Sequence, residues 1–235
     1  MQEQDVTVKG IILSAAPQGE YGRRLSILTD RYGKICVFAQ AAAKPKSHLM
    51  GVTLPMVCAE FTIARGRGAW NLHGVRLIEA FSSLSLDLEL SCHALYFLEV
   101  LSWFSQEGME ENEAKRLLNL TFVALRALSE EKDRKTEGEE KERAQRILLI
   151  RRIFELRILV IEGEYTEKPE GSASEAVEVL WKHVEQASLG ALYEEKFFSG
   201  IRPETAESFC YFAGQLFKRM VPCKFKSLAV LREFG

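Results

Sequence analysis

The sequence predicts a two-domain α+β protein, with a five-stranded OB-type β-barrel over residues 1–82 and an irregular all-helical domain over residues 83–235. Within residues 6–82 the apolar residues alternate with a period of two, in five segments separated by turn residues. From about residue 84 they recur every three or four positions instead. Five short strands in so short a stretch fit a closed barrel, because closure removes exposed strand edges.

The five strands are predicted in order along the first third of the chain. VTVKGIILSAA (6–16) is rich in β-branched residues and interrupted by Gly10. RRLSILTD (23–30) and KICVFAQA (34–41) flank a turn in which Gly33 can take the left-handed conformation of a bulged hairpin. PMVCAEFTIA (55–64) and WNLHGVRLIEAF (70–81) follow and are separated by RGRG. An SH3-like barrel would give a similar pattern.

The remainder of the chain predicts five or six helices. Helical periodicity is found in residues 86–106, 113–131, 143–164, 174–188 and 203–221. The segment 143–164 is apolar on most of its circumference, which is typical of a helix at the centre of a bundle. Gly163 is a suitable C-cap and Pro203 a suitable first helical residue. The charged segment 130–143 predicts a solvated loop, residues 164–174 a polar linker, and the last residues a short basic tail.

The composition indicates a globular protein without membrane or secretory signals. The chain has 235 residues, 47% hydrophobic and 27% charged, and no apolar run approaches the ~20 residues that span a bilayer. MQEQDVTVKG lacks the features of a signal peptide, so we expect a cytoplasmic protein. The five cysteines and four histidines are scattered, which predicts no disulfide framework, no metal site and no cofactor.

Catalytic motifs are missing from the sequence. It contains no nucleophile elbow, no phosphate-binding P-loop and no HExxH zinc motif. GRGAWN (66–71) begins like a dinucleotide fingerprint, but Asn71 replaces the third glycine and a strand follows where a helix is needed. We therefore expect a protein that is not an enzyme. A nucleic-acid hydrolase with an unrecognised site is the alternative that this reasoning leaves open.

Basic residues carry the stronger functional signal. Residues 1–80 contain ten Lys or Arg against six Asp or Glu, although the whole chain has a net charge of −2. Barrels of this type bind single strands by pairing cations with phosphates and stacking aromatic rings on bases. The predicted DNA-binding residues, which lie in or beside connections, are Arg23, Arg24, Lys34, Lys44, Lys46, Arg65 and Arg67. Interleaved aromatic residues are Tyr21, Tyr32, Phe38 and Trp70.

Two further interpretations concern protein partners. If the basic loop residues are merely solvated, the barrel would bind a protein and the molecule would be a non-enzymatic interaction adaptor. A second basic group lies near the C-terminus, beside Phe217 and Phe225. It is predicted to bind an acidic partner peptide with an apolar end, through Lys218, Arg219, Lys224 and Lys226. Lys218 and Arg219 would also stabilise the negative end of their own helix.

Four segments, in order along both halves, resemble the RecO-type recombination mediators of bacterial DNA repair. RRLSILTDRYGKICVFAQ (23–40) is similar to the family's second and third strands with their turn. KPKSHLMGVTLPM (44–56) resembles its P-K-S segment, FELRILVIEGE (154–164) its central helix, and CKFKSLAVLREF (223–234) its closing motif.

The resemblance implies an N-terminal OB-fold, a C-terminal helical domain and a non-enzymatic role in the RecF pathway of recombination, in a cytoplasmic, nucleoid-associated protein. It implies binding of single- and double-stranded DNA, strand annealing, and help in loading RecA onto DNA coated by single-strand-binding protein. The implied partners are RecR and the acidic tail of that single-strand-binding protein.

The sequence departs from the family's pattern in two places. Many members carry four cysteines after the central helix, forming a zinc site, and EYTEKPEGSAS (164–174) has none, which indicates a zinc-free member. Ala41 and Ala43 stand where glycine and arginine are usual before the P-K-S segment. Because Ala43 lacks the positive charge of an arginine, we expect this segment to bind phosphates more weakly.

Overall fold

The computed structural model describes residues 4–133, 140–163 and 174–234. By their internal contacts these fall into two compact units, one combining residues 1–86 with 94–119 and the other combining 87–93 with the residues from 120 onward. The domain limit between residues 82 and 83 stays a prediction. Of the predicted charged loop at 130–143, residues 134–139 lie outside the described residues, and the residues on either side of them are helical. The predicted polar linker at 164–174 lies outside the described residues except for Ser174.

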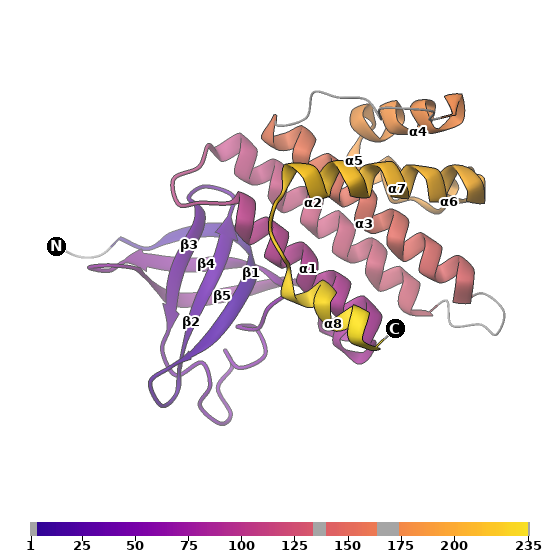
Figure 1. Cartoon of the computed structure of the whole chain (residues 1–235). Coiled ribbons are helices and arrows are strands. Elements are labelled where there is room, and N and C mark those ends of the chain that lie inside the picture. The colour runs from indigo at the N-terminus through magenta and orange to yellow at the C-terminus, as the bar shows by residue number, and fades with distance from the viewer. Residues whose placement is uncertain (1–3, 134–139, 164–173, 235) are drawn as a thin grey trace. The chain divides into compact units, whose positions relative to one another are not determined.

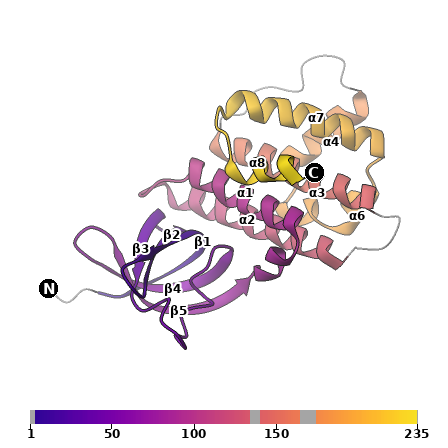
Figure 2. The same cartoon turned by 60° about the horizontal axis from the view of Figure 1, so that its bottom comes forward.

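The N-terminal third forms a closed five-stranded barrel (Figures 1 and 2). Its strands are β1 (Val6–Gln18), β2 (Gly22–Thr29), β3 (Gly33–Ala39), β4 (Val57–Arg65) and β5 (Trp70–Ala80). Their order around the barrel is β1-β2-β3-β5-β4, with β3 and β5 parallel and the other pairs antiparallel. This closed barrel, with four antiparallel strand pairs and one parallel pair, confirms the predicted OB-type architecture.

Strand β1 is continuous, so the predicted interruption at Gly10 is wrong. Gly10 is paired with Thr29 of β2 and also with Ala59 of β4, where the strand passes from one neighbour to the other. A Cβ atom at this position would lie 2.6 Å from the carbonyl oxygen of Leu28. Glycine therefore permits the close approach that lets the strand coil around the barrel.

Gly33 takes the left-handed conformation that the turn sequence predicted, with φ of 66°. The structure adds a second reason for glycine at this position. A Cβ atom would lie 2.2 Å from the carbonyl oxygen of Gln106, in the connection that follows the first long helix. That connection pairs with the start of β3, since the amide of Lys34 donates to Gln106 and the amide of Gly108 donates to Tyr32, each at 3.0 Å. Residues 105–110 thus cover one end of the barrel.

The barrel interior is filled by alternate residues of each strand. Leu25, Ile27, Val37, Phe61 and Ile63 are completely buried. Their immediate neighbours along the strands are at least partly exposed, except Leu28 and Ala64, which are also buried. This alternation is what the period of two predicted. It also fixes which residues of β2 and β3 face solvent, and those are the residues from which a ligand surface can be built.

The described part of the chain contains eight α-helices, more than the five or six expected. They are α1 (Leu88–Phe104), α2 (Glu111–Glu130), α3 (Glu140–Glu162), α4 (Glu175–Gln186), α5 (Leu189–Leu192), α6 (Glu195–Ser199), α7 (Pro203–Met220) and α8 (Lys226–Phe234). The surplus arises because one irregular stretch holds the short α5 and α6, and because the basic tail forms α8. None of the helices in the described residues is both long enough and apolar enough to cross a bilayer.

Helix α3 is the central helix of the second unit, as its apolar pattern predicted, and it packs against α4 and α7 (Figure 1). Gly163 follows its last residue with φ of 69°, the expected C-cap conformation. Glu155 of α3 is buried and paired with Arg152 at 2.5 Å and with Arg151 at 3.5 Å. A buried carboxylate needs such partners, because an unpaired charge in the core is strongly destabilising.

Candidate nucleic-acid interface

The connection between β3 and β4, residues 40–56, is a turn-rich loop with two exposed lysines. Its backbone closes on itself through three hydrogen bonds, in which Lys44, Ser47 and Met50 each donate to the residue three positions earlier. Lys46 has φ of 64°, a left-handed conformation that costs about 1–2 kcal/mol for a residue other than glycine. The loop therefore has a defined backbone, and Lys44 and Lys46 lie exposed on it.

Arg23 anchors this loop to the barrel. Its Nη1 atom donates to the hydroxyl of Thr53 at 2.7 Å, to the carbonyl oxygen of Met50 at 2.8 Å and to that of Thr53 at 3.3 Å. The Thr53 hydroxyl in turn donates to the carbonyl oxygen of Leu49 at 2.7 Å. The amide of Ala43 donates to the carbonyl oxygen of Tyr21, which joins the loop to the β1–β2 turn. Arg23 thus positions the loop, a role that the sequence did not predict.

Arg24, the next residue, points the other way and is exposed on the outer surface of β2. The register places it opposite Phe38 of β3, which is partly exposed between the buried Val37 and Ala39. Phe38 is paired in turn with Asn71 of β5. Arg24, Phe38 and Asn71 therefore form a row across three adjacent strands on the outside of the barrel.

Lys34 has a structural partner. Its Nζ atom donates to the carbonyl oxygen of Ser102 and lies 3.4 Å from the hydroxyl of that residue. Ser102 is in the last turn of α1, where carbonyl groups lack partners within the helix and carry the negative end of its dipole. Partial burial lowers the pKa of Lys34 below its ordinary value of 10.5. Lys34 caps a helix, and its ammonium group is largely engaged there.

Arg65 is the last residue of β4, and Arg67 lies in the β4–β5 turn. The Arg65 guanidinium lies 4.9 Å from the centre of the Trp70 ring and pairs with Glu107 at 2.8 Å. Trp70 also contacts Tyr32, with ring centres 4.8 Å apart. Arg67 is exposed. The predicted cations therefore come from several separate strands and connections around the barrel.

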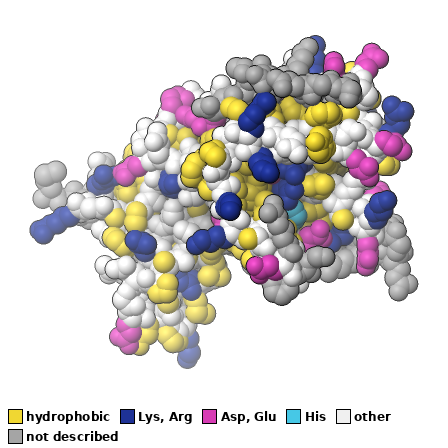
Figure 3. Space-filling view, viewed as in Figure 1, with side chains coloured by type: hydrophobic (Ala, Val, Ile, Leu, Met, Phe, Trp, Pro, Cys, Tyr) yellow, Lys and Arg dark blue, Asp and Glu magenta, His cyan; other side chains and the backbone are white. Residues whose placement is uncertain are grey.

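The outer face holds a pocket that sequence reasoning missed. It has a volume of about 240 Å³ and lies where β2, β3 and β5 meet, lined by Gln18, Gly22, Arg23, Phe38, Ala39, Gln40 and Asn71. Phe38 is one of the aromatic residues interleaved with the predicted DNA-binding residues. Nothing in the sequence marks Gln18, Gln40 and Asn71 as pocket residues, because glutamine and asparagine near strand ends are ordinary surface residues. Figure 3 shows basic side chains spread over the barrel in one view.

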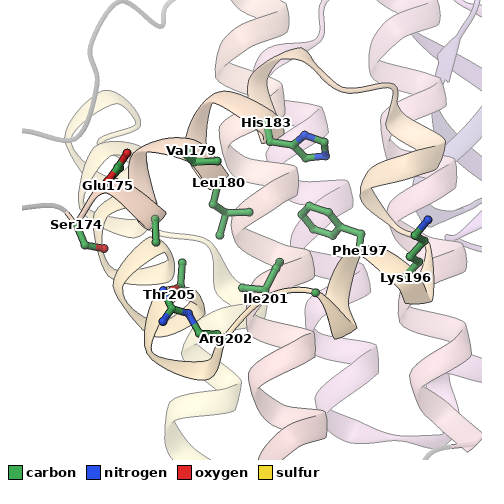
Figure 4. A pocket seen from close by; sticks show the side chains of 12 residues that line it. Ser174, Glu175, Val179, Leu180, His183, Lys196, Phe197, Ile201, Arg202 and Thr205 are labelled. Atoms are coloured by element: carbon green, nitrogen blue, oxygen red, sulfur yellow. The ribbon is translucent and has the colours of Figure 1, made fainter.

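The helical domain has a groove of about 770 Å³ between α4, α6 and the start of α7 (Figure 4). Its floor is apolar and includes Val179, Leu180 and Ile201, and the ring of Phe197 stacks against His183 with centres 5.7 Å apart. Lys196 and Arg202 lie at the rim. This groove could not be predicted from the sequence, because the short helix α6 that builds one wall lies in a stretch without clear periodicity.

The four basic residues predicted to bind a partner peptide lie around the end of α7. Lys218 and Arg219 are in its last turn, where they stabilise the helix dipole, while Lys224 and Lys226 are exposed beyond it. Phe217, expected to supply an apolar wall, is 95% buried in the helical core. Phe225 is partly exposed. Among the described residues, no group of three or more His, Cys, Asp or Glu side chains could hold a metal ion.

The strand order and closure of the barrel define an OB-type fold, which in other proteins binds oligonucleotides and oligosaccharides. Comparison with known proteins agrees with this class. A family model described as "Recombination protein O N terminal" matches residues 1–81. Proteins named "DNA repair protein RecO" from Acetivibrio thermocellus and Desulforudis audaxviator are 30% and 32% identical to this chain, each over 66% of the chain and 55% of the relative.

A third relative of the same name, from Caldicellulosiruptor bescii, is 26% identical over 69% of the chain and 60% of its own length. These matches support the assignment to the RecO family and agree with the resemblance drawn from the four segments. It spans a little over half the length of the curated relatives it matches.

Proposed function

We propose that this chain is a mediator of DNA repair and homologous recombination that binds single- and double-stranded DNA, anneals complementary strands and assists RecA loading. Membership of a family whose curated members are named DNA repair proteins supports the proposal. The observation that carries it is the loop of residues 40–56, which Arg23 holds to the barrel while Lys44 and Lys46 stay exposed. A loop fixed in this way loses little entropy when its cations meet phosphates.

Phosphate contacts are assigned to the exposed cations Arg24, Lys44, Lys46 and Arg67. Arg23, Lys34 and Arg65 support the surface through their partners within the protein, although Arg65 is exposed enough to exchange Glu107 for a phosphate. Contacts of this kind give affinity without sequence specificity, with a salt slope of about −0.7 per phosphate on single strands. Annealing follows if the barrel neutralises the repulsion between two strands and leaves most base edges free to pair.

The helical domain is proposed to bind protein partners, namely RecR and the acidic tail of single-strand-binding protein. An acidic peptide with an apolar end requires cations around an apolar wall. The groove of Val179, Phe197, Lys196 and Arg202 combines both, and the basic residues around the end of α7 are the second candidate. Through such a contact the protein would be recruited to coated DNA, where RecA is then loaded.

We propose no bond-breaking activity for this chain, and the following test would also detect strand cleavage. Purified protein is mixed with labelled single strands and duplexes in low salt, and binding and annealing of complementary strands are followed. The expected result is salt-sensitive binding and faster annealing. If the protein bound neither form, the adaptor interpretation would replace this one. Strand cleavage that requires added Mg²⁺ or Mn²⁺ and copurifies with the protein would instead indicate a hydrolase.

A further inference from the structure

The pocket on the outer barrel face is built by the strand register. Phe38 points outward because Val37 and Ala39 on either side of it are buried inside the barrel. Its neighbour across β5 is Asn71, and the Asn71 side chain leans over Gly66, where a Cβ atom would lie 2.8 Å from the Asn71 Nδ2 atom. Glycine at that turn therefore leaves room for the amide beside the pocket.

The lining combines one ring with three carboxamides. Phe38 supplies the ring, Gln18, Gln40 and Asn71 supply the carboxamides, and Gly22, Arg23 and Ala39 complete the lining. The lining residues include no carboxylate. The volume of about 240 Å³ lies below the ~300–1,000 Å³ of pockets that take drug-sized ligands, so it suits a single flat ring system.

We propose that this pocket receives one unstacked nucleobase of a DNA single strand. The base would stack on Phe38 and present its edge to the carboxamides, while the strand's phosphates run toward Arg24 on one side of Phe38. Each carboxamide both donates and accepts hydrogen bonds, and every base edge offers both kinds of group. The pocket therefore accepts any base, which suits a protein that binds strands without regard to sequence.

This inference rests on the proposed function, because it requires a bound strand, but it goes further by giving one base its own site. A protein that bound DNA through its phosphates alone would have the same affinity for a normal strand and for one without bases. A free nucleotide carries the same ring as a strand but lacks the run of phosphates that the cations bordering the pocket would hold. Strands with bases, abasic strands and a mononucleotide therefore separate the possible ligands.

The test measures the affinity of the full chain for oligothymidylate, for an abasic strand of equal length and for thymidine monophosphate, at one fixed salt concentration. The variants are Phe38→Leu, which keeps an apolar side chain without a ring face, and Gln40→Ala at an exposed position. Tyr211→Leu, which removes an exposed aromatic ring from α7, is the matched control. Thermal unfolding checks that each variant is folded.

Phe38→Leu should weaken oligothymidylate binding about tenfold, the typical loss when one base–aromatic stack is removed. Gln40→Ala should weaken it less, and Tyr211→Leu not at all. Binding of the abasic strand should be unchanged in all three. A 2-aminopurine placed in the strand should lose fluorescence on binding to the parent protein and keep more of it with Phe38→Leu.

Three results would overturn the inference. In the first, Phe38→Leu binds oligothymidylate as well as the parent does. In the second, Phe38→Leu loses as much affinity for the abasic strand as for oligothymidylate, while the parent protein still binds DNA. Thymidine monophosphate could bind as tightly as the strand, which would make the pocket a site for free nucleotides. If the parent protein bound neither strand, the proposed function would fail first and the base site would fail with it.

Discussion

The guanidinium of Arg23 donates a 2.7 Å hydrogen bond to the hydroxyl of Thr53, thirty residues further along the chain. This bond joins β2 to the far end of the loop that carries Lys44 and Lys46. Arg23 and its neighbour Arg24 are identical in type and adjacent in sequence, yet one holds the protein together and the other lies exposed on the candidate interface. The pair therefore allows structural and binding roles to be separated by experiment.

Replacing Arg23 with alanine should destabilise the barrel by about 2 kcal/mol, because hydrogen bonds to a charged group contribute about 1.5–3 kcal/mol. Arg24→Ala should change stability by less than about 0.5 kcal/mol, as is usual at exposed positions without partners. Urea unfolding gives both values. In the same samples Arg24→Ala should weaken DNA binding. If the two variants were equally stable, the anchoring role of Arg23 would be refuted.

Removing both loop charges should reduce DNA affinity and its dependence on salt. Lys44→Gln/Lys46→Gln is expected to lower the magnitude of the slope of log K against log salt by about 1.4 on single strands, at about 0.7 per lost phosphate contact. The control is Lys141→Gln/Lys182→Gln, which removes two exposed lysines from α3 and α4. A double loop variant that bound and annealed DNA like the parent in low salt would show that the loop does not contact phosphates.

Lys34→Met should affect folding more than DNA binding. The variant keeps the apolar stem but loses the ammonium group that donates to Ser102 at the end of α1. A loss of about 1 kcal/mol of stability is expected, the typical effect of one capping interaction. DNA affinity at equal folded concentration should stay close to that of the parent. A large drop in affinity without any change in unfolding would restore Lys34 as a phosphate contact.

The two candidate peptide sites make opposite predictions. Val179 is 63% exposed on the groove, so Val179→Glu should leave the fold intact while placing a like charge against an acidic peptide. Together with Lys196→Gln/Arg202→Gln, it should weaken binding of a labelled acidic peptide with an apolar end, measured by fluorescence anisotropy. Lys218→Gln/Arg219→Gln serves as the comparison. Loss of binding in that variant alone would place the peptide beside α7.

The sequence could predict the barrel because its signals are local. Alternation in five segments and the turn at Gly33 were enough to fix the strands and the fold class. The roles of Arg23 and Lys34 could not be predicted, because a basic residue beside a turn has the same pattern whether it meets a phosphate or a carbonyl group. That choice depends on register and on residues such as Thr53 and Ser102, which are distant in sequence. The groove was missed for the same reason, since its walls come from α4, α6 and α7.

His93 of α1 gives a prediction about pH. Its side chain is buried, with 5% exposure to solvent, and this burial, followed by the nearby Arg151 and Arg152, lowers the pKa of His93 to about 3. In the unfolded chain a histidine takes up a proton near pH 6.5. Between these two values the unfolded state binds one more proton than the folded state, so His93 makes stability rise with pH across this range. Its contribution is complete above pH 6.5 and is lost as the pH falls toward 3.

His93→Leu removes this titration and should make the free energy of unfolding less sensitive to acid. Between pH 6 and pH 4 the slope should decrease by up to about 1.4 kcal/mol per pH unit, the value for one proton. Urea unfolding at several pH values measures it in both proteins. The control is His48→Leu, which replaces an exposed histidine in the loop of residues 40–56. An unchanged slope in His93→Leu would mean that the proton reaches this site in the folded protein as readily as in the unfolded chain, and that the helical domain opens around α1 before it unfolds.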